Sequence, residues 1–468
     1  MKALLLALGV LGAIAAPSVA RADDDEQTQF EAQPHRKTYS LGDCLALVDR
    51  NHPNNWAARA RVGVARGQLD EARYLPYFQW YAQAAVGVLP NITGSVLYTQ
   101  FSPNAIINPS SFAGGYDPFF SVSLNINLPL YTFGKISAGL DLATANVRYN
   151  EWDAEKYREL SRMDVRRAYF GVLYARDARY LVKEIIKKLD KAIDGISAKL
   201  DKGEKDVEET DRFRLQLYRD ETLARGADAD RGESYALAAL RFLTGVQTDF
   251  DVPDVPLKKP DVALAPIVRY LAAARLFRPE VNMARAGVAA RKSELDLQRA
   301  RFFPDIGLAM NASYSVAPSV VAQNNGFAAN NFNYFGYGIV LGARWSLDLP
   351  TNQARVEQSE SRLEETRALE RLALGGIAVE VENAYASTIE SRTREEHWDH
   401  AEHLARQWIA TIESEVDLGT KDERAVIEPL RAYVGARLEH IRALNDLNVN
   451  MSDLARVSGW DAAAPTGN

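Results

Sequence analysis

The stretch FSVSLNINLPL, residues 120–130, alternates large apolar side chains with serine or asparagine as far as Leu128. This period of two predicts a β-strand with one apolar face and one small, polar face. A tilted strand of about ten residues is long enough to cross the hydrocarbon core of a bilayer. The stretch therefore predicts a strand suited to lipid on one face and water on the other.

Three more stretches show the same alternation: 306–316 and 335–347 clearly, and 80–88 more weakly. The segments that join the strands, 91–118 and 318–332, are long and polar, as the extracellular loops of membrane barrels are. A soluble β-sandwich also has alternating strands, but very long helical segments flank these four, which favours the membrane interpretation. Four strands cannot close a barrel, because the smallest single-chain barrels have about eight. We therefore expect three copies to share a twelve-stranded barrel.

The chain contains an internal repeat. ARARVGVARGQLD at 58–70 corresponds to ARAGVAARKSELD at 284–296, and each segment is followed by a proline, Pro76 or Pro304, expected to end a helix before a strand. Pro129 and Pro350 are expected to close matching strands. The order of elements in each copy is then helix, strand, loop, strand and long helical stretch, with copies at 39–250 and 251–460 and a tail at 461–468.

Two proline-free stretches predict unusually long helices, at 136–200 and 352–415. At 1.5 Å per residue these helices would be roughly 98 and 96 Å long, which indicates coiled-coil packing. Each ends near a glycine in a polar turn, Gly203 or Gly419, as expected for a left-handed helix C-cap. Returning helices are expected at 207–243 and 423–457. The predicted fold is mainly α with membrane β-strands, and its long coiled-coil helices extend from the strands.

The N-terminus predicts export. Lys2 precedes an apolar run, and the sequence Ala20-Arg21-Ala22 resembles a signal-peptidase site, so 1–22 is predicted to be a signal peptide and 23–38 a polar segment. The single cysteine, Cys44, lies in an apolar helical pattern and is interpreted as a packing residue. A net charge of -7 gives no basic footprint for nucleic acid. Catalytic and cofactor-binding motifs are absent from the sequence, so neither an enzyme nor a cofactor is expected.

Several motifs, in this order, resemble the TolC-like outer-membrane efflux family over about residues 39 to 460. They are YSLGDCLALVDRNHP at 39–53, the helix ending in Leu75-Pro76, LPLYTFGK at 128–135, and Leu418-Gly419-Thr420 with the helix 425–447. The resemblance implies a homotrimer in the lipid of the outer membrane, with a twelve-stranded barrel and an α-helical tunnel reaching into the periplasm. It also implies docking to a periplasmic adaptor and an inner-membrane pump, in efflux or type I secretion.

The resemblance also implies site residues at the tips of the long helices. Rings of acidic side chains narrow the family's tunnel after the turn glycines, and the matching positions are Glu209, Glu428 and Ala425. Ala425 carries no charge, which weakens that match, and a solvated helix face is an equally good interpretation of the two glutamates. The expected adaptor-docking residues are Lys202, Gly203 and Glu204 in one turn and Leu418, Gly419 and Thr420 in the other. The charged first turn departs from the family's apolar pattern.

Three histidines near one another, His397, His400 and His403, invite a metal interpretation. At 100° per residue, however, His403 lies about 240° around the helix from His397, so one helix cannot close the site, and an exposed polar face with no metal is expected. The function that the sequence favours is a passive export conduit. The alternatives are a soluble periplasmic coiled-coil scaffold or adaptor and, more remotely, a surface porin or adhesin.

Overall fold

The computed structural model describes residues 37–77, 79–90, 115–202, 208–318 and 332–460. Residues from Thr38 onward form one compact unit. The predicted signal peptide, nearly all of the polar segment 23–38, the C-terminal tail and most of both strand-connecting loops lie outside the described residues. In chain order the elements are β1(Lys37–Thr38), α2(Leu41–Asn51), α3(Pro53–Tyr74), β2(Gln79–Pro90), β3(Tyr116–Tyr131), α4(Lys135–Asp201), α5(Glu209–Thr244), β4(Phe250–Asp251), α6(Ile267–Phe277), α7(Pro279–Ala300), β5(Asp305–Val316), β6(Tyr334–Arg344), α8(Leu349–Asp417), η2(Glu423–Val426) and α9(Ile427–Ser458).

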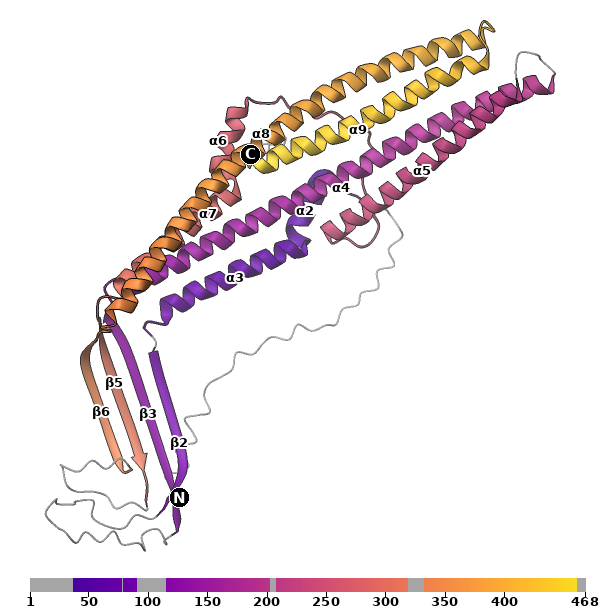
Figure 1. The fold of residues 1–468 in the computed structure, drawn as a ribbon. Coiled ribbons are helices and arrows are strands. Elements are labelled where there is room, and N and C mark those ends of the chain that lie inside the picture. Colours follow the sequence, from indigo (N-terminus) through magenta and orange to yellow (C-terminus); the bar gives the residue numbers. More distant parts are fainter. Residues whose placement is uncertain (1–36, 78, 91–114, 203–207, 319–331, 461–468) are drawn as a thin grey trace, which may run out of the picture. The chain divides into compact units, whose positions relative to one another are not determined.

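The four predicted long strands form one antiparallel sheet in the order β2-β3-β5-β6 (Figure 1). The register places apolar residues opposite one another across all four strands, as in the row Trp80, Ile126, Met310 and Ile339. The alternate rows are polar or small, as in Gln83, Ser123, Ser313 and Gly336. The predicted separation of an apolar face from a polar face is therefore confirmed, and β2 and β6 are the outer strands.

The predicted role of Pro350 is wrong. β6 ends at Arg344, and Pro350 lies in the first turn of α8, where its missing N–H costs no helical hydrogen bond. Trp345 follows the strand and donates its indole N–H to the Phe302 carbonyl at 2.9 Å. Pro129 lies inside β3 at a shift of register against β5, so it interrupts the pairing two residues before the strand ends.

Both long helices are present. α4 has 67 residues and α8 has 69, so each is about 100 Å long. The returning helices α5 and α9 end at Gly245 and Gly459, which have φ of 71° and 64°, a left-handed conformation that favours glycine. The order of elements therefore occurs twice, while the boundaries 39–250 and 251–460 stay a prediction. No helix in the described ranges is long and apolar enough to span a membrane.

The helices pack side by side in one layer. Away from the sheet, the helix contacts give the order α5–α4–α9–α8, and nearer the sheet they give α3–α4–α7–α8 (Figure 1). α8 is thus at one edge of the layer along its whole length, and α3 and α5 share the other edge.

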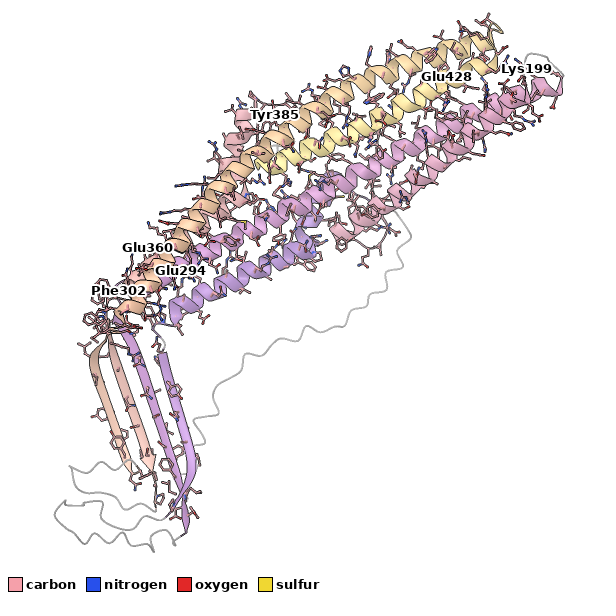
Figure 2. The ribbon with its side chains drawn as sticks, viewed as in Figure 1. Lys199, Glu294, Phe302, Glu360, Tyr385 and Glu428 are labelled. Carbon is pink, nitrogen blue, oxygen red and sulfur yellow. The ribbon has the colours of Figure 1, made fainter. Side chains whose placement is uncertain are left out.

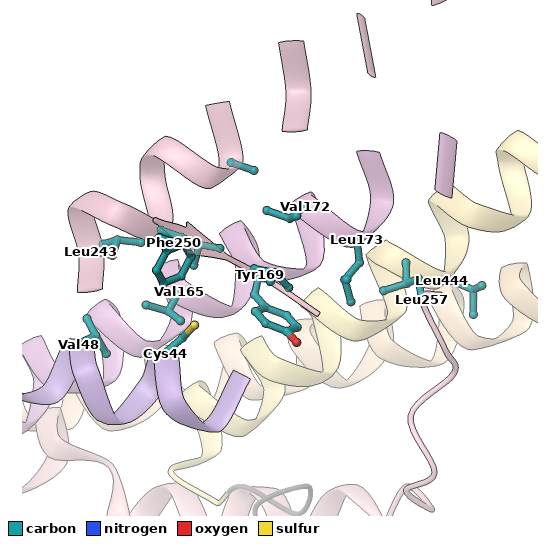
Figure 3. Packing of buried hydrophobic residues seen from close by; sticks show 13 residues of the cluster. Cys44, Val48, Val165, Tyr169, Val172, Leu173, Leu243, Phe250, Leu257 and Leu444 are labelled. Carbon is teal, nitrogen blue, oxygen red and sulfur yellow. The ribbon is translucent and has the colours of Figure 1, made fainter. Parts of the chain in front are cut away.

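Four apolar clusters of the described residues hold these helices together, and two of them position the site. One lies where α2 meets α4 and α5, and it contains Cys44, Val165 and Leu243 (Figure 3). Burial raises the pKa of the Cys44 thiol to about 12, so this side chain packs as a neutral group. The other core joins α4, α5, α8 and α9 in the half of the layer toward the helix tips. The tips therefore lie at the end of a continuous four-helix core.

Candidate functional site at the helix tips

The turn between α8 and α9 is a complete Schellman motif. Gly419 has φ of 70°, the Thr420 N–H donates to the Glu415 carbonyl at 2.9 Å, and the Gly419 N–H donates to the Val416 carbonyl at 2.9 Å. The Thr420 hydroxyl also donates to the Glu415 carbonyl, at 2.8 Å. This turn holds Leu418 outward with 76% of its surface exposed. The turn therefore presents one apolar side chain on a backbone held by three hydrogen bonds.

The turn between α4 and α5 lies partly outside the described residues, including the predicted docking positions Gly203 and Glu204. Lys202 caps the end of α4 and is exposed. On the other side of the turn, α5 begins with a capping box, in which the Glu208 N–H donates to the Asp211 carboxylate at 3.3 Å. This reciprocal cap satisfies N–H groups at the helix start and positions Asp211.

Asp211 connects the hairpin of α4 and α5 to the hairpin of α8 and α9. The sequence did not predict this role. Its side chain is 5% exposed, and its Oδ2 lies 3.6 Å from Nη1 of Arg424 in η2. Seven residues further along each element, the Arg431 guanidinium lies 5.7 Å from the ring centroid of Tyr218. Two side-chain contacts with the same spacing on both elements show that the start of α5 is aligned in register with η2 and the start of α9. The capping pattern predicts the position of Asp211, but no local pattern pairs it with Arg424.

This register places Glu209 and Glu428 at different heights. Asp211 is paired with Arg424 and Tyr218 with Arg431, so Glu209 is level with Asp422, six residues nearer the tip than Glu428. Six residues of helix correspond to about 9 Å. The two predicted acidic positions therefore belong to two separate levels, and Asp422 shares the outer level.

The two glutamates also differ in their neighbours. The Glu209 carboxylate accepts a hydrogen bond from Arg212 at 2.8 Å, and the Asp422 carboxylate lies 3.2 Å from Arg424. Glu428 is exposed in the first turn of α9 (Figure 2) and has no ion-pair partner among the described residues. Ala425, partly buried in η2, adds no charge between these levels. Among these three carboxylates, Glu428 is therefore the one whose charge is least compensated by the described residues.

The three histidines lie far from the turns, on the exposed side of α8. His403 is within 3.1 Å of the Gln407 amide, one turn further on. Across the described ranges, no group of three or more His, Cys, Asp or Glu side chains is arranged to hold a metal ion. No contact within the described part of the chain brings these histidines to the tip residues.

Known proteins resemble the chain in sequence and in fold. A family model described as outer membrane efflux protein matches residues 50–246 and 271–459. Among solved structures, CusC has a TM-score of 0.73 at 16% identity, covering 94% of this chain and 99% of that one. The open MtrE outer membrane channel of Neisseria gonorrhoeae has a TM-score of 0.72 at 16% identity, covering 92% and 91%. The CmeC outer membrane channel of Campylobacter jejuni has a TM-score of 0.71 at 13% identity, covering 90% and 86%. No curated protein sequence matches.

Proposed function

The chain belongs to the outer membrane efflux protein family, and from this premise we propose that three copies form one passive channel through the outer membrane and into the periplasm. The single observation that supports this most is the four-stranded sheet. Its outer strands β2 and β6 are each paired on one side. Strands in lipid must satisfy their backbone groups by closing into a barrel, so β6 of one copy would pair with β2 of the next.

The faces of the sheet suit this arrangement. Val86 and Tyr337, on the apolar face, are each 79% exposed in the single chain, and lipid would cover them. On the other face, Asn311 donates to Asn125 at 2.7 Å, and the Ser121 and Ser315 hydroxyls are 2.9 Å apart. These small, uncharged groups would line a water-filled pore. The family match displaces the soluble scaffold as the alternative, and no catalytic step is part of the proposal.

The helix tips would form the periplasmic entrance. In a threefold assembly Glu428 would recur three times at one level, with Glu209 and Asp422 nearer the entrance. A ring of uncompensated carboxylates attracts cations and repels anions. Because Glu209 and Asp422 are each paired with an arginine, Glu428 would dominate the selectivity.

The turns would bind a periplasmic adaptor that connects the channel to an inner-membrane pump. Leu418 offers an exposed apolar contact on a backbone that Gly419 and Thr420 hold in place. The charged first turn, with Lys202, Gly203 and Glu204, would contribute polar contacts. Such a combination of an apolar anchor and a polar rim is common at specific protein interfaces.

The test of the assembly is fractionation followed by native electrophoresis of the detergent-solubilised protein. A trimer in the outer-membrane fraction that dissociates on heating supports the proposal, and a water-soluble monomer would contradict it. The test of the entrance is ion selectivity in planar bilayers. Glu428→Gln should lower cation selectivity more than Glu209→Gln, and Glu364→Gln, on the exposed side of α8 away from the tips, is the control. Equal selectivity in all three variants would contradict the role of Glu428.

A further inference from the structure

The four long strands carry very few charged side chains. Across β2, β3, β5 and β6 the charged residues are Asp117, Asp305 and Arg344, so Arg344 is the one basic residue of these strands. Asp305 begins β5 and Arg344 ends β6, so both lie at the end of the sheet that joins the helices (Figure 1). On a surface of small, uncharged groups, one charged position decides which sign of ion is attracted.

The strand register places Arg344 on the polar face of the sheet. Side chains alternate between the two faces of a strand. Ile339 belongs to an apolar row, and Arg344 is five positions further along β6 with no shift of register between them, so Arg344 lies on the opposite face. A cavity of about 510 Å³ at this end of the sheet is lined by Arg344 together with the polar-face residues Asn127 and Gly342. In the proposed channel this face lines the pore.

The surroundings of Arg344 leave its charge accessible. The side chain is exposed and has no ion-pair partner among the described residues. Gly338 and Gly342 share its face of β6, and a methyl group added at either glycine would meet no atom within 4 Å. Solutes in the pore could therefore approach the guanidinium closely.

The carboxylate opposite Arg344 is bound to another cation. Asp305 pairs with Arg344 in the strand register, but its Oδ1 lies 2.7 Å from Nζ of Lys135, at the start of α4. The Lys135 ammonium also donates to a backbone carbonyl at 2.8 Å, which holds it in place. These three residues carry one excess positive charge per copy. Arg301 and Asp348, which cap α7 and α8, are opposite in sign and together add no net charge.

This positive level is far from the acidic level at the helix tips. Arg344 lies just before α8, and Glu428 lies just beyond the other end of that helix. The 69 residues of α8 separate the two levels by roughly 100 Å. Charges in water are screened over about 10 Å at 0.1 M salt, so the two levels would act on passing ions independently.

We propose that Arg344 from three copies forms a cationic ring where the barrel begins, and that this ring attracts anions as they enter the barrel. The inference rests on the proposed trimeric channel and adds a second selectivity element, opposite in sign to the acidic entrance. Arginine binds carboxylates and phosphates through two parallel hydrogen bonds. Solutes that carry these groups are therefore the class that the ring favours.

Ion selectivity in planar bilayers tests the ring, with potassium and chloride as the probes. The detergent-purified trimer is placed between about 0.01 and 0.1 M KCl, where charges act over roughly 10 to 30 Å, and the reversal potential gives the permeability ratio. A unit charge about 10 Å away in water changes the local concentration of an ion about twofold. Arg344→Gln should therefore raise the potassium-to-chloride permeability ratio about twofold, and Arg344→Glu should raise it further. Arg344→Lys keeps the charge and should leave the ratio unchanged.

The outcomes separate this inference from the proposed function. A ratio that rises in the order lysine, glutamine, glutamate at position 344, with an increase that disappears at about 1 M KCl, where screening acts over about 3 Å, supports the ring. Conducting channels in which the three variants have the same ratio, or in which the increase persists at high salt, overturn the ring and leave the trimeric channel standing. Absence of conducting channels from the wild-type protein would instead contradict the proposed function.

Discussion

Oε2 of Glu402 lies 2.5 Å from Nδ1 of His440, between α8 and α9 where both side chains are buried. Arg437 donates to both oxygens of the same carboxylate at 3.0 and 2.8 Å, and Arg406 donates to it at 2.6 Å. Burial alone would raise the pKa of Glu402, but the hydrogen bonds from His440 and Arg437 outweigh it and hold the pKa at about 2. Glu402 is therefore an ionised centre that joins the two helices of the second hairpin.

The first prediction follows from that pKa. Since the folded value of about 2 is below the ordinary value of 4.5, Glu402 stabilises the fold fully above about pH 4.5 and loses this contribution as the pH falls toward 2. Near neutral pH the ionised Glu402 contributes about 3 kcal/mol to the free energy of unfolding. Glu402→Gln should therefore lower the unfolding temperature clearly at pH 7 and less at pH 3. Glu364→Gln, on the exposed side of the same helix, should change little. A difference between wild type and Glu402→Gln that is equal at both pH values would contradict this assignment.

The second prediction concerns Arg176, which ties α4 to α5 and to the segment after α5. Its side chain is 7% exposed, its Nε donates to Glu233 at 2.7 Å, and its Nη1 donates to the Val252 carbonyl at 2.6 Å. Arg176→Met would leave the buried Glu233 carboxylate with less positive charge beside it. We expect the free energy of unfolding to fall by about 3 kcal/mol. Hydrogen exchange of residues 250–257 should become faster. Arg241→Met, on the exposed side of α5, should leave this exchange unchanged, and equal effects of the two variants would argue against the tie.

The third prediction separates backbone strain from side-chain volume. Gly419→Ala places a residue with a Cβ at a left-handed backbone position, φ of 70°. This strain should lower the free energy of unfolding by about 1 kcal/mol. The cost should appear as faster hydrogen exchange at residues 415–421. Gly435→Ala, at an exposed position of α9 with nothing within 4 Å of the added methyl, should be neutral or stabilising by up to about 1 kcal/mol. The Schellman geometry would be contradicted if Gly435→Ala were the more disruptive of the two.

The fourth prediction concerns the contact between the hairpin tips. Arg424→Ala removes the cation 3.6 Å from the buried Asp211 carboxylate, so the start of α5 should separate more readily from η2. We expect a larger mean single-channel conductance in planar bilayers. Arg214→Ala removes an arginine on the same helix as Asp211, 3.9 Å away and 75% exposed, and should leave the conductance unchanged. Unchanged conductance in Arg424→Ala would show that the Asp211–Arg424 pair does not restrict the tips.

Most elements of the fold could be predicted from patterns of neighbouring residues. The two wrong predictions, the end of the last strand and the role of Pro350, also came from such patterns. The alternation in 120–130 identified β3 because every second side chain shares one face of a strand. The stretch 335–347 continued the apolar pattern past Arg344, where the strand ends, and Pro350 was assigned to a strand because a proline can end one. The same proline fits the first turn of a helix equally well, so its role depends on which element follows.

The acidic positions at the tips show the limit of such patterns. Spacing from the turn glycines selected Glu209 and Glu428, but it could not place them about 9 Å apart in height, because that offset depends on how α5 is aligned with α9. Asp211 was not selected, although it is the buried carboxylate in contact with the second hairpin. Its partner, Arg424, is more than 200 residues away in the chain.

The sequence by itself determined the four alternating strands, the two helices of about 100 Å and the glycines that end helices, since periodicity and backbone conformation are properties of neighbouring residues. Only the tertiary structure decided which carboxylates are paired, which helices form the edges of the layer, and that Glu209 and Glu428 lie at different heights. The physical reason is that burial, ion pairing and relative height arise between segments far apart in the chain. Their alignment is set by the packing of whole helices.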